Sequence, residues 1–365
     1  ALRLPVRLNA NENPWGPGPM ARAAIARTVD EGSRYGFDML GKLVEAIAAH
    51  EQLDKDRIVV GSGSGELLDM LAMAWCERGQ VTCAWPTFSQ LMAYAERFGA
   101  EIRKVPLDAS LRHDLGALAA ATSANTALLY VCNPNNPTGT AVAGAPLREF
   151  CRAMSQRTLV VVDEAYMELV DEGATESMVD LVRAGENVVV LRTFSKIHGL
   201  AGLRIGYALA RPDVAQRLRR LQVTSPNVLG VAAATASLGD TQFLAETRRR
   251  ILDAWPKWEE RLERWRQGMK RAGHSDRTAD QFGALLAGAD LAIADKLPHA
   301  DNVDDDIARF GLAQLAEQAD DLADWRKMLD HVTTAPLDVQ RNGRRVNAAQ
   351  LLELQMGRIE ITGDL

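Results

Sequence analysis

The sequence predicts an α/β protein built on a mainly parallel, seven-stranded, doubly wound sheet with helices on both faces. From about Arg57 onward, short apolar runs alternate with amphipathic helical segments, as expected for successive βα units. Most of these runs are continuously apolar rather than alternating, which is typical of parallel strands covered on both faces. The predicted strands are Ile58–Val60, Val81–Ala84, Ile102–Val105, Ala127–Val131, Leu159–Val162, Val188–Leu191 and Ile205–Ala208.

The chain divides into three predicted parts. Residues 1–37 are rich in Asn, Pro and Gly, which predicts an extended arm followed by one short helix. Residues 38–240 form the large domain. Residues 241–365 begin with a long charged helix, from about Asp240 to Ala272, and continue into a smaller domain. Beyond about Gly273 the sequence is acidic and looks helical, without clear strands.

Composition excludes several classes of protein. The chain has 365 residues, 47% of them hydrophobic and 25% charged, a composition typical of globular proteins. A net charge of −6 and the absence of a large basic cluster argue against a nucleic-acid partner. No run approaches the roughly 20 apolar residues of a membrane helix, so no membrane association is expected. We expect no metal site or disulfide framework, but four buried thiols: Cys76, Cys83, Cys132 and Cys151.

The sequence leaves two possible cellular compartments. The sequence starts at Ala1 rather than Met. The cytoplasm is the expected compartment, and export followed by removal of a signal is the alternative.

A serine and a lysine follow the predicted strand Val188–Leu191. Ser195 and Lys196 therefore fall at the carboxyl edge of the sheet, where open α/β sheets gather their ligands. A lysine attacks a carbonyl only when burial or a nearby cation lowers its pKa. Arg204 could supply that cation or bind an anion. Taken alone, the segment is better explained as a loop with a solvated lysine and arginine, and the rest of the chain has to decide.

A glycine-rich loop, Gly61–Glu66, follows the first predicted strand and opens a helix. Backbone N–H groups at a helix N-terminus favour a phosphate. Glu66 occupies the place of the third glycine in a dinucleotide fingerprint, and no Gly-Lys-Ser/Thr is present, so a single phosphate group is the better interpretation. The alternative is a flexible turn with a serine cap.

Two more strand ends carry polar side chains. Asn133-Pro134-Asn135-Asn136-Pro137-Thr138-Gly139 follows the strand Ala127–Val131, and its amides could grip a planar polar ligand. Asp163 and Tyr166 follow the next strand. Asn-Pro loops are often simple turns, and Asp163 alone could cap a helix. The four strand ends together fit pyridoxal phosphate, which needs a lysine, an acidic partner for its ring nitrogen and a phosphate cradle.

These motifs resemble those of fold-type I pyridoxal-phosphate aminotransferases, most closely the histidinol-phosphate aminotransferase branch. The resemblance covers residues 8 to about 210 and includes, in order, Asn11-Glu12-Asn13-Pro14, Arg34-Tyr35, the Gly61–Glu66 loop, Asn135-Asn136-Pro137-Thr138-Gly139, Asp163-Glu164-Ala165-Tyr166 and Ser195-Lys196 with Arg204. It implies the pyridoxal-phosphate transferase fold, with a smaller C-terminal α+β domain.

The resemblance also implies roles for individual residues. Lys196 would form the Schiff base and move protons, and Asp163 would keep the ring nitrogen protonated. Asn136 and Tyr166 would bind the ring oxygen. The remaining implied contacts are the phosphate ligands Ser64, Gly65, Ser195 and Arg204, the ring-stacking Phe88, the substrate-bordering Asn11, and Tyr35, which would reach the phosphate of a neighbouring subunit in a homodimer.

The resemblance weakens near the C-terminus, where the family carries a substrate-binding arginine. Arg358 resembles it, but the following glycine lies one residue late, and residues from about 275 to 350 match nothing in the family pattern. The expected reaction moves an amino group between an amino acid or a histidinol-phosphate-like amine and a 2-oxo acid such as 2-oxoglutarate. A decarboxylase of phosphorylated amino acids and a non-catalytic binding protein are the alternatives. His198 is expected to pack or cap rather than act as a second base.

Overall fold

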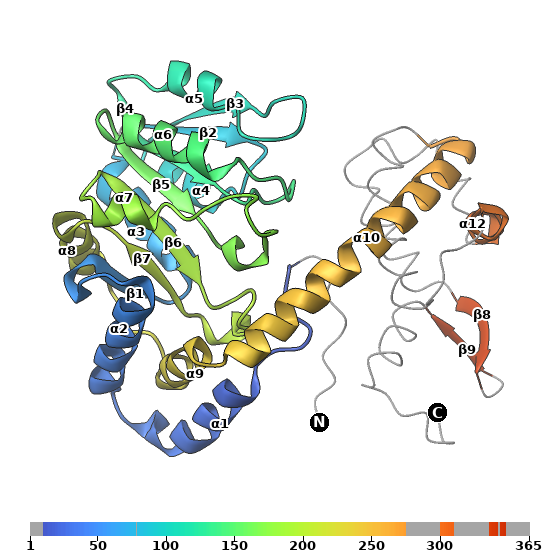
Figure 1. Ribbon diagram of the computed structural model, residues 1–365, viewed down its shortest axis with the longest axis horizontal. Coiled ribbons are helices and arrows are strands. Elements are labelled where there is room, and N and C mark those ends of the chain that lie inside the picture. The colour runs from blue at the N-terminus through green and yellow to red at the C-terminus, as the bar shows by residue number, and fades with distance from the viewer. Residues whose placement is uncertain (1–9, 78, 275–299, 310–335, 342–343, 348–365) are drawn as a thin grey trace. The chain divides into compact units, whose positions relative to one another are not determined.

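The computed structural model describes residues 10–77, 79–274, 300–309, 336–341 and 344–347 (Figure 1). All seven predicted strands form, and together they make one sheet in the order β1-β7-β6-β5-β4-β2-β3. The pairs β2–β3, β2–β4, β4–β5 and β5–β6 are parallel, whereas β7 runs antiparallel to both β1 and β6. The strands are β1 (Ile58–Gly61), β2 (Gln80–Trp85), β3 (Glu101–Pro106), β4 (Thr126–Cys132), β5 (Leu159–Asp163), β6 (Val188–Thr193) and β7 (Gly206–Leu209). The prediction of a mainly parallel seven-stranded sheet is confirmed.

Helices cover both faces of this sheet (Figure 1). Buried side chains of α3 (Ser64–Trp75), α4 (Gln90–Arg97) and α8 (Pro212–Leu221) form one apolar cluster with one face. A second cluster, on the other face, draws on the helices α1 (Pro19–Thr28), α2 (Phe37–Glu51), α5 (Leu115–Ala121), α6 (Gly144–Ser155), α7 (Val179–Arg183) and α9 (Val228–Leu238). Short 3₁₀ turns complete the large part of the chain: η1 (Val29–Ser33), η2 (Lys55–Arg57), η3 (Met167–Leu169) and η4 (Ala201–Leu203).

Alternation along the central strands assigns residues to the two faces. In β5, Leu159 and Val161 belong to the α3 cluster, whereas Val160 and Val162 belong to the other. Since successive side chains of a strand point to opposite faces, the Asp163 side chain lies on the same face as Leu159 and Val161, the α3 side. The next residue, Glu164, falls on the opposite side.

The helix starts differ in how they are capped. The Asp114 side chain accepts the Ala117 N–H at 2.9 Å ahead of α5, and Asn227 accepts the Gly230 N–H at 2.7 Å ahead of α9. Each interaction satisfies one of the N–H groups that a helix start leaves without a partner. At α3 the capping position is Gly63, and no described side chain caps the helix. The first N–H groups of α3 are therefore available to a ligand.

Contact density divides the chain into two compact units, residues 11–249 and residues 1–10 with 250–365. The long helix α10 (Thr241–Arg271) agrees with the predicted charged helix. In the second unit, α12 (Ala300–Arg309) packs against it through the buried residues Met269, Val303 and Ile307. The antiparallel pair β8 (Pro336–Arg341) and β9 (Arg344–Asn347) lies in a stretch where we expected no clear strands. That expectation was wrong for these residues.

No single described helix is long and apolar enough to cross a membrane, although the bent pair of α9 with Thr241–Asp253 passes the same criteria by length and composition. The four cysteines are buried free thiols, as predicted. Burial raises the pKa of Cys83 to about 11 and that of Cys76 to about 12. These thiols are therefore protonated and packed at neutral pH.

Candidate active site

The carboxyl ends of β1, β4, β5 and β6 meet at one edge of the sheet, because these four strands run in the same direction. This edge carries the glycine loop, the Asn-Pro loop, Asp163 and the Ser195-Lys196 segment. The sequence-predicted groups are thus brought together by parallel topology rather than by closeness in the chain.

The glycine loop and Arg204 form an anion cradle. Arg204 Nη2 donates to the Ser62 carbonyl at 3.5 Å, and its Nη1 donates to Ser195 Oγ at 3.4 Å. Gly63 has a left-handed φ of 83°, a conformation that favours glycine, and a Cβ there would crowd Arg204 Nη2. The uncapped N-terminus of α3 adds the N–H groups of Ser64 and Gly65. A guanidinium, a hydroxyl and a helix N-terminus together are the donors that a phosphate takes.

Asp163 is almost completely buried, at 2% exposure. Its Oδ2 accepts the Tyr130 hydroxyl at 2.9 Å, and its Oδ1 accepts the Ala165 N–H at 3.2 Å. Burial raises the pKa of this carboxyl, and the two hydrogen bonds and the charge of Lys196 act against that rise. Among the described residues no cation forms an ion pair with Asp163. A cationic ring nitrogen would therefore be a favourable partner.

Lys196 is half-buried and lies beside Tyr166. Its Nζ is 5.3 Å from the centre of the Tyr166 ring and donates to the Asn11 carbonyl at 3.2 Å. Burial lowers the pKa of Lys196; Glu12 and Asp163 oppose this effect and Arg204 adds to it. A lowered pKa leaves more of the amine in the neutral, nucleophilic form.

The predicted ring-oxygen ligands converge on one hydroxyl. Tyr166 Oη accepts the amide of Asn11 at 3.0 Å and that of Asn136 at 3.4 Å. Burial raises the pKa of Tyr166, so its hydroxyl stays protonated near neutral pH. Asn11 has a left-handed φ of 50°, a conformation that asparagine tolerates better than most residues.

The N-terminal arm is held against the lysine loop. Asn13 Nδ2 donates to the Ile197 carbonyl at 2.7 Å. Gly16 and Gly199 touch so closely that a Cβ on Gly16 would lie 2.4 Å from the Gly199 Cα. This contact and the Asn13 hydrogen bond place Asn11 next to Lys196 and Tyr166.

The other predicted site residues are less constrained. Phe88 is half-buried after β2 and packs against the α3 cluster. Tyr35 is 87% exposed and stacks on Phe37 with 5.6 Å between ring centres, so it does not reach the site of its own chain. Arg358 lies outside the described residues. His198 is buried, and its Nδ1 lies 2.6 Å from Ser237 Oγ, a packed position that fits the predicted structural role.

Sequence reasoning missed two sets of groups at this edge. Tyr130 was included only as part of a buried strand, yet its hydroxyl contacts Asp163. On the opposite side of the sheet, Arg192 pairs with the buried Glu164, with 2.9 Å between Nη2 and Oε2, and with the partly exposed Glu168. A polar-tipped residue inside an otherwise apolar strand was the available signal for both Tyr130 and Arg192.

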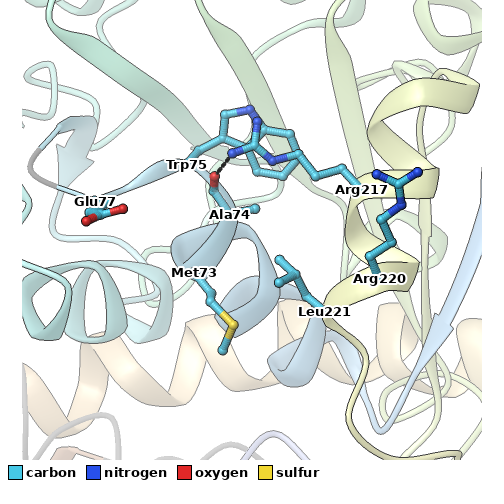
Figure 2. Close-up of a pocket in the computed structure, with 7 residues that line it drawn as sticks. All are labelled: Met73, Ala74, Trp75, Glu77, Arg217, Arg220 and Leu221. Carbon is cyan, nitrogen blue, oxygen red and sulfur yellow. Dashed lines mark hydrogen bonds between the residues drawn. The ribbon is translucent and has the colours of Figure 1, made fainter.

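A separate surface pocket lies at the far end of α3, between that helix and α8 (Figure 2). Arg217 donates to the Ala74 carbonyl, and its guanidinium is 4.4 Å from the centre of the Trp75 ring. A cation beside the last carbonyls of a helix stabilises its negative end. We therefore interpret Arg217 as part of the α3–α8 packing.

Comparison with known proteins identifies the family. Residues 5–270 match the family described as aminotransferase class I and II. The chain belongs to this family. A histidinol-phosphate aminotransferase of Moorella thermoacetica is 41% identical over 246 residues, which are 67% of this chain and 64% of that protein. An aromatic amino acid aminotransferase of Rhodococcus jostii is 41% identical over 258 residues, covering 68% of this chain and 72% of the relative.

The aminotransferase fold is also found among solved structures. The crystal structure of a histidinol-phosphate aminotransferase from Sinorhizobium meliloti in complex with pyridoxal 5′-phosphate aligns with a TM-score of 0.64 and 30% identity, over 72% of this chain and 70% of that one. The chain spans just under two thirds of the length of the Moorella thermoacetica protein. The predicted fold-type I resemblance and the α/β fold class are confirmed.

Proposed function

We propose that this member of the aminotransferase family is a pyridoxal-phosphate-dependent enzyme. In the proposed reaction it moves an amino group between an amino acid or a histidinol-phosphate-like amine and a 2-oxo acid such as 2-oxoglutarate. The relatives named for histidinol phosphate and for aromatic amino acids support this substrate range.

The observation that carries the proposal is the set of three groups at one sheet edge. A half-buried lysine with a lowered pKa, a buried carboxylate without a cationic partner among the described residues, and an uncapped helix N-terminus beside Arg204 lie together. They match the aldehyde, the ring nitrogen and the phosphate of the cofactor in that order. When bound, pyridoxal phosphate supplies an aldehyde that captures amines and a ring that accepts electrons from the substrate.

The residues of the chain then have distinct proposed roles. Lys196 is the covalent attachment point and carries the proton that leaves and returns to the substrate. Asp163 holds the ring nitrogen protonated, and Tyr166 with Asn136 binds the ring oxygen. Ser64, Gly65, Ser195 and Arg204 hold the phosphate, and Phe88 stacks on the ring. Asn11 borders the substrate.

We further propose a homodimer in which Tyr35 reaches the phosphate of the partner subunit. Tyr35 and Phe37 are 87% and 67% exposed, which is unusual for two stacked aromatic rings. Light scattering of the purified protein tests this arrangement, because a monomer at working concentration would exclude a shared site.

Lys196→Ala tests the proposed function directly. We expect the visible absorbance of the bound cofactor and turnover with a panel of amino donors both to be lost. Lys55→Ala is the control, because Lys55 forms only an exposed pair with Glu45 at 2.9 Å and should leave both signals unchanged. A Lys196→Ala protein that transaminates normally would overturn the assignment. If the wild type releases carbon dioxide from the amino donor instead of forming a 2-oxo acid, the decarboxylase alternative is favoured.

A further inference from the structure

Tyr130 is a fully buried tyrosine in the middle of the sheet. Its exposure is 0%, and the other residues of β4 from Ala127 to Val131 are aliphatic. A buried hydroxyl without a hydrogen bond is costly, so its partner is informative. That partner is Asp163, whose Oδ2 accepts the hydroxyl at 2.9 Å.

The strand register accounts for this contact. β4 and β5 are parallel neighbours in which Tyr130 pairs with Val161 and Cys132 pairs with Asp163. Residues two apart on a strand share a face, so Tyr130 and Asp163 lie diagonally on the α3 side. A phenol is long enough to span such a diagonal.

Both oxygens of Asp163 are thereby held by neutral donors. Tyr130 binds Oδ2, and the Ala165 N–H binds Oδ1 at 3.2 Å. Two donors on two oxygens fix the rotation of the carboxylate without neutralising its charge. Since each carboxylate oxygen can accept more than one hydrogen bond, a further donor can still bind.

We propose that Tyr130 is a positioning residue, which orients the Asp163 carboxylate toward the protonated ring nitrogen of the cofactor. The identity of that ring rests on the proposed function above. Tyr130 itself does not touch the reacting atoms and acts only through Asp163.

The electrostatics agree with this role. Burial raises the pKa of Tyr130 well above its usual value, and the charge of Asp163 raises it further, so the phenol remains a donor across the working pH range. The same hydrogen bond lowers the pKa of Asp163 against the effect of burial. Loss of the hydroxyl would therefore favour the protonated, neutral carboxyl.

The test compares Tyr130→Phe with Tyr207→Phe in the intact chain. Tyr207 is a matched control because it is also buried and its hydroxyl also donates to a carboxylate, Glu51 Oε1, at 2.6 Å. The readout is the Kd for pyridoxal phosphate, measured by titrating the cofactor-free protein, together with its pH profile. We expect Tyr130→Phe to raise this Kd about tenfold, and Tyr207→Phe to leave it unchanged.

The pH profile has a definite sign. Because the Asp163 pKa rises in Tyr130→Phe, cofactor affinity should begin to fall at a higher pH than in the wild type. A double-mutant cycle supplies the second measurement: in an Asp163→Asn background, Tyr130→Phe should cause no further loss. An equal loss in both backgrounds would contradict action through Asp163.

The outcomes separate the two proposals. If the wild type binds pyridoxal phosphate and Tyr130→Phe behaves like Tyr207→Phe, the role of Tyr130 is wrong and the proposed function stands. If the wild type does not bind the cofactor, both proposals are wrong.

Discussion

Asp163 and Glu164 are adjacent carboxylates with opposite environments. Asp163 lies on the α3 side of the sheet and is held by a phenol and a backbone N–H. Glu164 lies on the other side, where Arg192 is 2.9 Å away and Ser177 and the Met178 N–H donate at 2.8 and 2.7 Å. Asp163 and Glu164 are 2% and 0% exposed, respectively.

The difference between them lies in the partner rather than in the burial. Inside the protein, the charge of Glu164 is balanced by the ion pair with Arg192. Arg192 also pairs with Glu168 at 2.9 Å. Burial alone would lower the pKa of Arg192, but Glu164 and Glu168 raise it, so the guanidinium stays charged. Among the described residues no cation forms an ion pair with Asp163, so a cationic ligand can take that place. Of two buried acids, the one without a cation is the better candidate for binding or catalysis.

The largest expected effects come from Asp163→Asn and Glu164→Gln, and they fall on different quantities: the first variant loses cofactor affinity and the second loses stability. Asp163→Asn removes an unneutralised buried charge, so stability should hold while the Kd for pyridoxal phosphate rises about 100-fold. Glu164→Gln leaves Arg192 without its main partner and should lower the free energy of unfolding by about 3 kcal/mol. Chemical denaturation and cofactor titration measure the two quantities.

Each of these two variants controls for the other, since both replace a buried acid by its amide. If Glu164→Gln weakens cofactor binding more than Asp163→Asn, the distinction between a binding and a structural carboxylate is wrong.

A smaller effect is expected from the arm that borders the ligand side. Gly16→Ala places a Cβ 2.4 Å from the Gly199 Cα, and backbone cannot move aside as a side chain can. We expect the arm to be displaced from the lysine loop and the KM for the amino donor to rise about tenfold, which is within the usual cost of overpacking. Steady-state kinetics measures the change.

Gly202→Ala is the matched control, because Gly202 lies three residues after Gly199, in η4, and a Cβ there meets nothing within 4 Å. Equal kinetics for the two variants would show that the arm contact does not position the substrate side.

The last effect develops only in acid and concerns His198, which lies on the Glu164 side of the sheet against Phe194. Burial lowers its pKa from 6.5 to about 3, helped by the charges of His50 and Arg192. Because the folded pKa is depressed, the stability that neutral His198 contributes is present above pH 6.5 and is lost as the pH falls toward about 3. Through that window the wild type should lose about 1.4 kcal/mol of unfolding free energy per pH unit more than His198→Gln does.

Denaturation at a series of pH values measures these slopes. If the unfolding free energy has the same pH dependence in the wild type and in His198→Gln, His198 is protonated in the folded protein. Burial on the Glu164 side of the sheet would then lower its pKa less than expected.

Much of the fold could be predicted from the sequence because it is encoded locally. Apolar runs located all seven strands within a few residues, and the charged pattern located the helix α10. Residues at or shortly after strand ends, such as Asp163 and Lys196, could be assigned to one edge from strand direction alone. The β8–β9 pair was missed, because Pro336–Arg341 and Arg344–Asn347 carry several charged residues and lack an apolar run.

By itself, the sequence determined the strands, the order of the motifs and the family to which they belong, since these depend on periodicity and on residue types at fixed spacing. Only the tertiary structure decided what each buried acid contacts. Asp163 and Glu164 have the same chemistry and neighbouring positions, and their difference depends on strand register and on which face of the sheet carries Tyr130 or Arg192. Pairing across strands is a long-range property, so a local pattern cannot express it.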